Sequence, residues 1–212
     1  MNDYVTLVAG RFLTPFNIFW ERFRLPWINK LPATPLIYPH PGSFVPETSV
    51  GVQARGAIPL GSEVVLNYAA YVADRTRVVS WAGREGAAGD ADGEARVPEA
   101  ATVGGVIDLD DRKTWGGRLS LLPMPELEFG WSINYGDVIP EAVGPGEDEI
   151  LRQGVFLSYV RHVPSLGGDF DLKAEWIWTD HDERDGGYAQ FSYRPSAAGV
   201  DFLKHLEVVF RY

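Results

Sequence analysis

The densest cluster of candidate metal ligands is TDHDERDGG, at residues 179–187. Its carboxylates and histidine could hold a hard cation through oxygen ligands. The run lacks the Asp-x-Asp-x-Asp-Gly order of a calcium-binding loop. We therefore interpret it as a solvated hairpin loop, and we predict neither a metal site nor a cofactor.

Two acidic residues on one predicted strand, Glu126 and Glu128, raise the possibility of a glycosidase pair. Carboxylates on the same face of one strand do not flank a glycosidic bond as hydrolysis requires. The four histidines are scattered without a nucleophile motif, and the absence of cysteine removes thiol chemistry. The sequence predicts no catalytic residue and a protein that is not an enzyme. An enzyme with carboxylates in a sheet cleft is the weakest alternative.

Charged side chains recur on the polar faces of alternating segments. If these faces line a water-filled pore, their charges set its electric field and its ion preference. On the exposed sheet of a soluble protein, the same residues would only confer solubility. The candidate pore-lining residues are Arg55, Arg118, Glu126, Glu128, Asp171, Lys173, Glu175, Glu207 and Arg211.

Composition excludes several classes of protein. The formal net charge of -10 argues against nucleic acid as a partner, because binding phosphates needs lysine and arginine. No apolar run approaches the roughly 18 residues of a spanning helix, whereas a barrel strand needs only about 10 alternating residues. The opening residues MNDYVTLVAG have neither the basic nor the apolar region of a signal peptide. We expect either a cytosolic protein or a chain whose N-terminal part is missing.

Apolar and polar residues alternate in ELEFGWSINYG, at residues 126–136, as they do in a strand. This periodicity and the Gly, Pro, Asp and Ser punctuation predict a single all-β domain over residues 1–212. We expect about nine strands, near residues 3–13, 49–59, 63–74, 114–122, 126–137, 151–162, 169–180, 187–195 and 202–212.

The predicted connections alternate between tight and long. PLGSE, PMPE and PSLGGD (59–63, 123–126 and 164–169) fit hairpin turns. Long loops are expected near 14–48, 75–113 and 138–150, and transmembrane barrels have this asymmetry. The aromatic and proline-rich segment 16–43 is interpreted with about equal weight as a loop folded back into a pore or as a packed surface loop.

The apolar rows can face either a soluble core or lipid. Mid-strand glycines on the polar faces, such as Gly130 and Gly154, suit a crowded interior better than an exposed sheet. Tyrosine and tryptophan near the strand ends suit an interfacial girdle. These features favour a membrane barrel, with the candidate lipid-facing residues Leu127, Phe129, Trp131, Ile133, Tyr135, Trp176 and Trp178.

The segment VAGRFLTPFNIFWERFRLPWINKLPATPL, followed by PETSVGVQARGAIPLGS, resembles part of the bacterial outer-membrane porin-like proteins related to phosphate-selective porins. The match covers residues 8–60 and rests on Gly10, Arg11, Phe12, Pro15, Phe16, Trp27, Ile28, Asn29, Gly51, Val52 and Gln53. The resemblance implies a large antiparallel barrel, often trimeric, that passes small solutes. A barrel of about 16 strands would need more than about 300 residues if each strand and its connection took about 21 residues, as they do here.

We therefore predict an antiparallel transmembrane-type β-barrel of about eight to ten strands, or part of a larger porin barrel. Its predicted place is the bacterial outer membrane, with lipid and a homotrimer or another membrane complex as partners. Its predicted role is passive diffusion of small solutes or ions, or a structural part of a barrel. The alternative is a soluble β-barrel or sandwich that binds a small hydrophobic or carbohydrate ligand.

Overall fold

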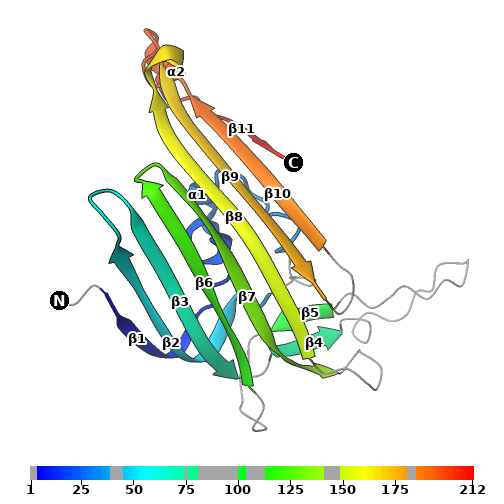
Figure 1. Ribbon diagram of the computed structural model, residues 1–212. Helices are drawn as coiled ribbons and strands as arrows, with labels where there is room; N and C mark the ends of the chain where they lie inside the picture. Colours follow the sequence, from blue (N-terminus) through cyan, green and yellow to red (C-terminus); the bar gives the residue numbers. More distant parts are fainter. Residues whose placement is uncertain are drawn as a thin grey trace, which may run out of the picture.

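The chain folds into a large antiparallel sheet (Figure 1). The computed structural model describes residues 4–38, 45–74, 76–80, 100–103, 113–140, 149–180 and 185–212. Nine strands follow one another across the sheet: β1 (Thr6–Leu13), β2 (Thr48–Pro59), β3 (Val65–Asp74), β6 (Lys113–Met124), β7 (Leu127–Pro140), β8 (Glu149–Val163), β9 (Gly168–Thr179), β10 (Asp185–Arg194) and β11 (Val208–Arg211).

The prediction of an all-β antiparallel fold is confirmed, and each of the nine predicted runs overlaps one of these strands, with most boundaries differing by one to three residues. The last run differs most from its prediction. Its first half forms the short helix α2 (Asp201–Lys204), and only Val208–Arg211 forms a strand. The Leu203 amide donates to the Val200 carbonyl at 3.1 Å, so a local turn satisfies backbone groups that a strand would leave to a neighbour.

Two short strands accompany the main sheet. β4 (Thr76–Ser80) runs parallel to the end of β7 and antiparallel to β5 (Ala100–Val103). Both lie within the predicted long loop 75–113, because four or five residues are too few to show a clear alternation. Much of that loop lies outside the described residues.

The connections differ at the two ends of the strands, as predicted. Tight turns join β2 to β3, β6 to β7 and β8 to β9, while the long connections lie at the opposite end. The link from β10 to β11 is the exception, since it lies at the tight-turn end and contains α2.

The sheet is not closed in the described part of the chain. β1 and β11 are the two ends of the strand order, and they do not pair with each other. The expectation of a barrel closed by eight to ten strands is therefore not met by these residues.

Residues 14–38, here called the inner segment, lie against one face of the sheet (Figure 1). The segment contains the single π-helical turn η1 (Phe19–Phe23) and the short helix α1 (Pro26–Asn29). No helix in the described residues is long and apolar enough to cross a membrane.

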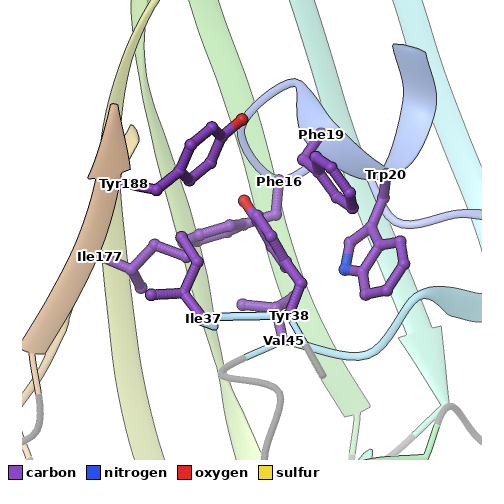
Figure 2. Packing of buried hydrophobic residues seen from close by; sticks show 8 residues of the cluster. All are labelled: Phe16, Phe19, Trp20, Ile37, Tyr38, Val45, Ile177 and Tyr188. Atoms are coloured by element: carbon purple, nitrogen blue, oxygen red, sulfur yellow. The ribbon is translucent and has the colours of Figure 1, made fainter. Parts of the chain in front are cut away.

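The main apolar cluster lies between the inner segment and the sheet (Figure 2). Phe19 and Tyr38 stack with ring centroids 4.8 Å apart, and Ile177 and Tyr188 reach them from β9 and β10. Most of its members precede β2, at Phe16, Phe19, Trp20, Ile37, Tyr38 and Val45. This core therefore forms between a connecting segment and the sheet, and not between two sheets.

Candidate functional site: the inner face of the sheet

The candidate site is the face of the sheet against the inner segment, here called the inner face. On β7, Glu128 is only 5% exposed, whereas its neighbour Phe129 is 43% exposed. On β9, Glu175 is buried and Trp176 is 49% exposed. Alternation along a strand sends neighbours to opposite faces, so the polar row faces inward and the apolar row outward.

The candidate lipid-facing residues all lie on the outer face. Phe129, Trp131 and Trp176 are exposed, and the others are half-buried by their neighbours on the strands. Exposed apolar side chains continue this face across the sheet at Val52, Val72, Trp115, Leu119, Val155, Val208 and Phe210. A contiguous exposed apolar surface of this extent is typical of an interaction site.

Most of the candidate pore-lining residues gather on the inner face. Those that are buried there are Arg118, Glu128, Asp171, Lys173 and Glu175, while Arg55, Glu207 and Arg211 are more exposed and contact the inner segment or its partners. Glu126 is not brought beside Glu128. It lies exposed in the turn before β7, where its carbonyl accepts a hydrogen bond from the Val160 amide at 2.9 Å.

Glu128 is held by an arginine of the inner segment. The Arg22 guanidinium donates to both carboxylate oxygens of Glu128, and the Ser120 hydroxyl donates to one of them at 2.6 Å. Such a bidentate pair fixes the orientation of both groups. The carboxylate therefore anchors the inner segment to the sheet.

A second carboxylate, Glu21, binds two arginines of the inner face. Its oxygens lie 2.5 Å from Arg118 and 2.9 Å from Arg55. Arg118 also donates to the backbone carbonyl of Asn17 at 2.6 Å, and the backbone amide of Asn17 donates to the Ser132 hydroxyl at 2.8 Å. The first turn of the inner segment is thus tied to β2, β6 and β7.

Lys30 is the main cation between the inner segment and β9–β11. Its ammonium lies 2.9 Å from Asp171, 2.5 Å from Glu207 and 3.0 Å from the Ser192 hydroxyl. Burial alone would lower the Lys30 pKa, but the hydrogen bonds to Glu207 and Asp171 outweigh it and raise this pKa above its ordinary value. For the Glu207 pKa, burial would raise it, but the hydrogen bonds from Lys30 and Ser192 lower it below its ordinary value.

Two tyrosines share the carboxylate of Glu175. Tyr38 of the inner segment donates to one oxygen, and Tyr188 of β10 donates to the other at 3.1 Å. Burial, followed by the nearby charge of Glu175, raises the Tyr38 pKa well above its ordinary value. Tyr38 is therefore a hydrogen-bond donor across the accessible pH range.

Near the β11 edge, Arg211 binds both the sheet and the inner segment. It donates to the Gln190 side chain at 2.9 Å and to the Ala33 carbonyl at 2.7 Å, and it also donates to the Asn29 side chain. Gln190 in turn donates to the Asn29 carbonyl at 2.7 Å. Polar contacts of the inner segment therefore reach the last strand of the sheet.

Sequence reasoning missed the inner-segment partners Arg22, Lys30 and Tyr38. The sequence does carry a signal for them: the connection between the first two strands mixes aromatic residues with charged ones. These charged residues pair with charges on the inner face. The polar-face glycines gave a second signal. A Cβ at Gly154 would lie 2.7 Å from the Asn17 side chain and 3.0 Å from the Phe16 ring, so glycine allows the segment to approach β8 closely.

The described residues contain no group of three or more His, Asp or Glu side chains that could hold a metal ion. The loop 179–187 is only partly described, and residues 181–184 lie outside the described residues. Its Asp180 side chain accepts a hydrogen bond from the Leu151 amide at 2.9 Å. The contacts of the inner face hold a protein segment against the sheet and place charged side chains along it.

Comparisons of the chain with protein-family models, with curated proteins and with solved structures found no match. The resemblance to porin-like proteins therefore stays a prediction.

Proposed function

We propose that this chain forms a stretch of outer-membrane β-barrel wall. Its outer face would meet lipid, and its inner face, with the inner segment folded on it, would line a water-filled lumen. The function would be passive diffusion of small solutes or ions, or structural support of such a barrel. No covalent chemistry is involved.

The observation that carries the proposal is the inverted burial of the strands. A soluble sandwich buries its apolar rows and exposes its charged rows. Here the charged side chains of Glu128 and Glu175 are buried, whereas Trp131 and Trp176 are exposed. Membrane barrels have this arrangement, with an apolar outer band about 25 Å tall.

Aromatic residues near both ends of the outer face support the proposal. Trp115 and Tyr135 lie together near the long-loop end, with ring centroids 5.3 Å apart. Near the tight-turn end, the ring centroid of Phe170 lies 6.2 Å from that of Tyr159 and 4.7 Å from that of Phe191. Aromatic rings at both edges of an apolar band are typical of membrane barrels.

The inner segment would narrow the lumen. It is tied to the wall by the adjacent residues Glu21 and Arg22 and, eight residues later, by Lys30. The Arg22 side chain remains 38% exposed, while the side chain of its partner Glu128 is buried. Water beside this part of the wall would meet more positive than negative charge, so we expect anions to be favoured locally.

The soluble ligand-binding alternative is less favoured. It requires the apolar rows to enclose the ligand, and those rows are the exposed ones on the described strands. The predicted trimer has no support from these observations and stays a prediction.

The proposal is tested by the depth of single tryptophans in reconstituted vesicles. One variant keeps only Trp131, and a matched variant keeps only Trp27, which is 75% exposed on the inner segment. All other tryptophans are replaced by phenylalanine. We expect lipids brominated on the acyl chain to quench Trp131 strongly and Trp27 weakly, while aqueous iodide quenches Trp27.

Iodide and caesium report the local charge in the same experiment. Relative to free tryptophan, Trp27 is expected to be quenched more by iodide than by caesium, because the inner segment presents more exposed positive than negative charge to the water. If the protein stays monodisperse without detergent and brominated lipid leaves Trp131 unquenched, the membrane proposal is wrong.

A further inference from the structure

The two edges of the sheet, β1 and β11, raise the question of what pairs with them. Natural edge strands are usually shortened, bulged or protected by proline and lysine. β1 has eight residues, TLVAGRFL, without proline or lysine, and it pairs with β2 in continuous register along its whole length. Leu7 on β1 is 73% exposed. This edge has the properties of a strand that receives a neighbour.

The direction of the edges limits what that neighbour can be. Eight pairings connect the nine strands in order, and all eight are antiparallel. Each pairing reverses the strand direction, so eight reversals leave β1 and β11 running the same way. Direct closure of the sheet would therefore need a parallel pair, whereas membrane barrels of this kind are antiparallel throughout.

A second copy of the chain cannot solve this problem. If the copy has the same orientation in the membrane, each junction joins β11 to β1 of the other copy, and both junctions are parallel. If a two-fold axis perpendicular to the barrel axis relates the copies, the junctions are antiparallel but one copy is inverted. Its tight turns would then lie on the opposite side of the membrane, against the asymmetry of such barrels.

The inner segment holds both sides of the sheet in place without such a neighbour. At its start, the Thr14 hydroxyl lies 2.8 Å from the Ser49 hydroxyl of β2, next to β1. Farther along, Lys30 reaches Glu207 before β11, and Arg211 on β11 donates to the Ala33 carbonyl. The segment thus braces the sheet from β2 to β11, so both edges are positioned in advance.

We propose that β1 and β11 receive the two ends of a further sheet segment with an odd number of antiparallel strands. These strands would alternate apolar side chains outward and polar side chains inward, continuing the nine strands into an even-numbered barrel. The inference rests on the proposed function, because it takes the sheet as a barrel wall.

The experiment supplies strands of known parity. One variant carries a copy of residues 149–194 (β8, β9 and β10) after Tyr212, joined by an Asn-Gly turn. The matched control carries a copy of residues 149–179 (β8 and β9) after the same turn. The copied β8 runs opposite to β11 in both, but the last strand is antiparallel to β1 only in the three-strand variant.

Hydrogen exchange of the β1 amides in lipid is the measurement. We expect exchange to be roughly tenfold or more slower in the three-strand variant than in the two-strand variant or the unextended chain. The amides of β7 should be protected in all three. Equal β1 protection in both extended variants, or full protection in the unextended monomer, would overturn the inference.

A second measurement does not depend on the folding of the extended variants. Because the chain has no native cysteine, Leu7→Cys and Phe210→Cys can be combined in the unextended chain. We expect both thiols to stay free under mild oxidation. A disulfide within one chain would indicate self-closure, and one between chains would indicate closure by a second copy; either result contradicts the inference. The tryptophan quenching test is separate, since Trp131 can be lipid-facing whatever the parity.

Discussion

The outer and inner faces of the same strands follow opposite rules. On the outer face, large apolar side chains such as Trp131 are exposed, and they have no partner element among the described residues that covers them. On the inner face, charged side chains such as Glu128 are buried and paired with the inner segment. Burial in this sheet therefore follows what covers each face, and not the hydrophobicity of the residues on it. The energetic cost of a substitution should likewise depend on its face.

The largest effect should come from a charge on the outer face. We expect Trp131→Arg to lower the free energy of unfolding in lipid by about 2–4 kcal/mol, the cost of a cation near the bilayer midplane. The matched control, Leu166→Arg, changes a 61% exposed residue in the turn between β8 and β9. It should cost about 0–1 kcal/mol, because that end is close to the interface.

Urea unfolding of both variants in vesicles provides the measurement. If Trp131→Arg and Leu166→Arg lower the free energy of unfolding by the same small amount, the outer face meets water. The two faces would then not differ in what covers them.

The inner face can be tested through the pair of Arg22 and Glu128. We expect Glu128→Ala to cost about 2 kcal/mol, less than for a fully buried pair because Arg22 is partly exposed to solvent. The double variant Arg22→Ala/Glu128→Ala should cost less than the sum of the single variants. Additive costs in this double-mutant cycle would mean that the pair does not anchor the inner segment.

The strand pattern was predictable because it depends on local alternation. The alternation of apolar and polar residues in ELEFGWSINYG is enough to predict β7, and proline and glycine indicate the tight turns. The identity of the covering element was not predictable. The contacts of Glu128 with Arg22 and of Asp171 with Lys30 join residues 106 and 141 positions apart, and no local pattern encodes such pairs.

The prediction for Glu126 shows a related limit. Glu126 is two residues before Glu128, so in a continuous strand both side chains would lie on the same face. β7 begins only at Leu127, however, and Glu126 therefore lies in the turn. Element boundaries are the least reliable part of a sequence prediction, and here a two-residue difference separates a buried anchor from an exposed carboxylate.

The smallest effect concerns Lys30, and its sign depends on pH. Because its pKa in the folded chain is raised above 10.5, Lys30 stabilises the fold below about pH 10.5, and this stabilisation is lost as the pH rises through the folded pKa. Because the Glu207 pKa is lowered below 4.5, its contribution is present above about pH 4.5 and is lost as the pH falls. Lys30→Met should therefore cost about 1 kcal/mol between these limits.

Unfolding of the wild-type chain and of Lys30→Met at pH 3.5, 7 and 11 would measure this dependence. The difference between the two proteins should be largest at pH 7 and should shrink in both directions. Lys30→Arg keeps the positive charge and should retain most of the stability at pH 11, because arginine stays protonated there. A difference that is constant with pH would mean that Lys30 acts through packing alone, and the polar anchoring of the inner segment near β11 would then rest on Arg211 and its partners.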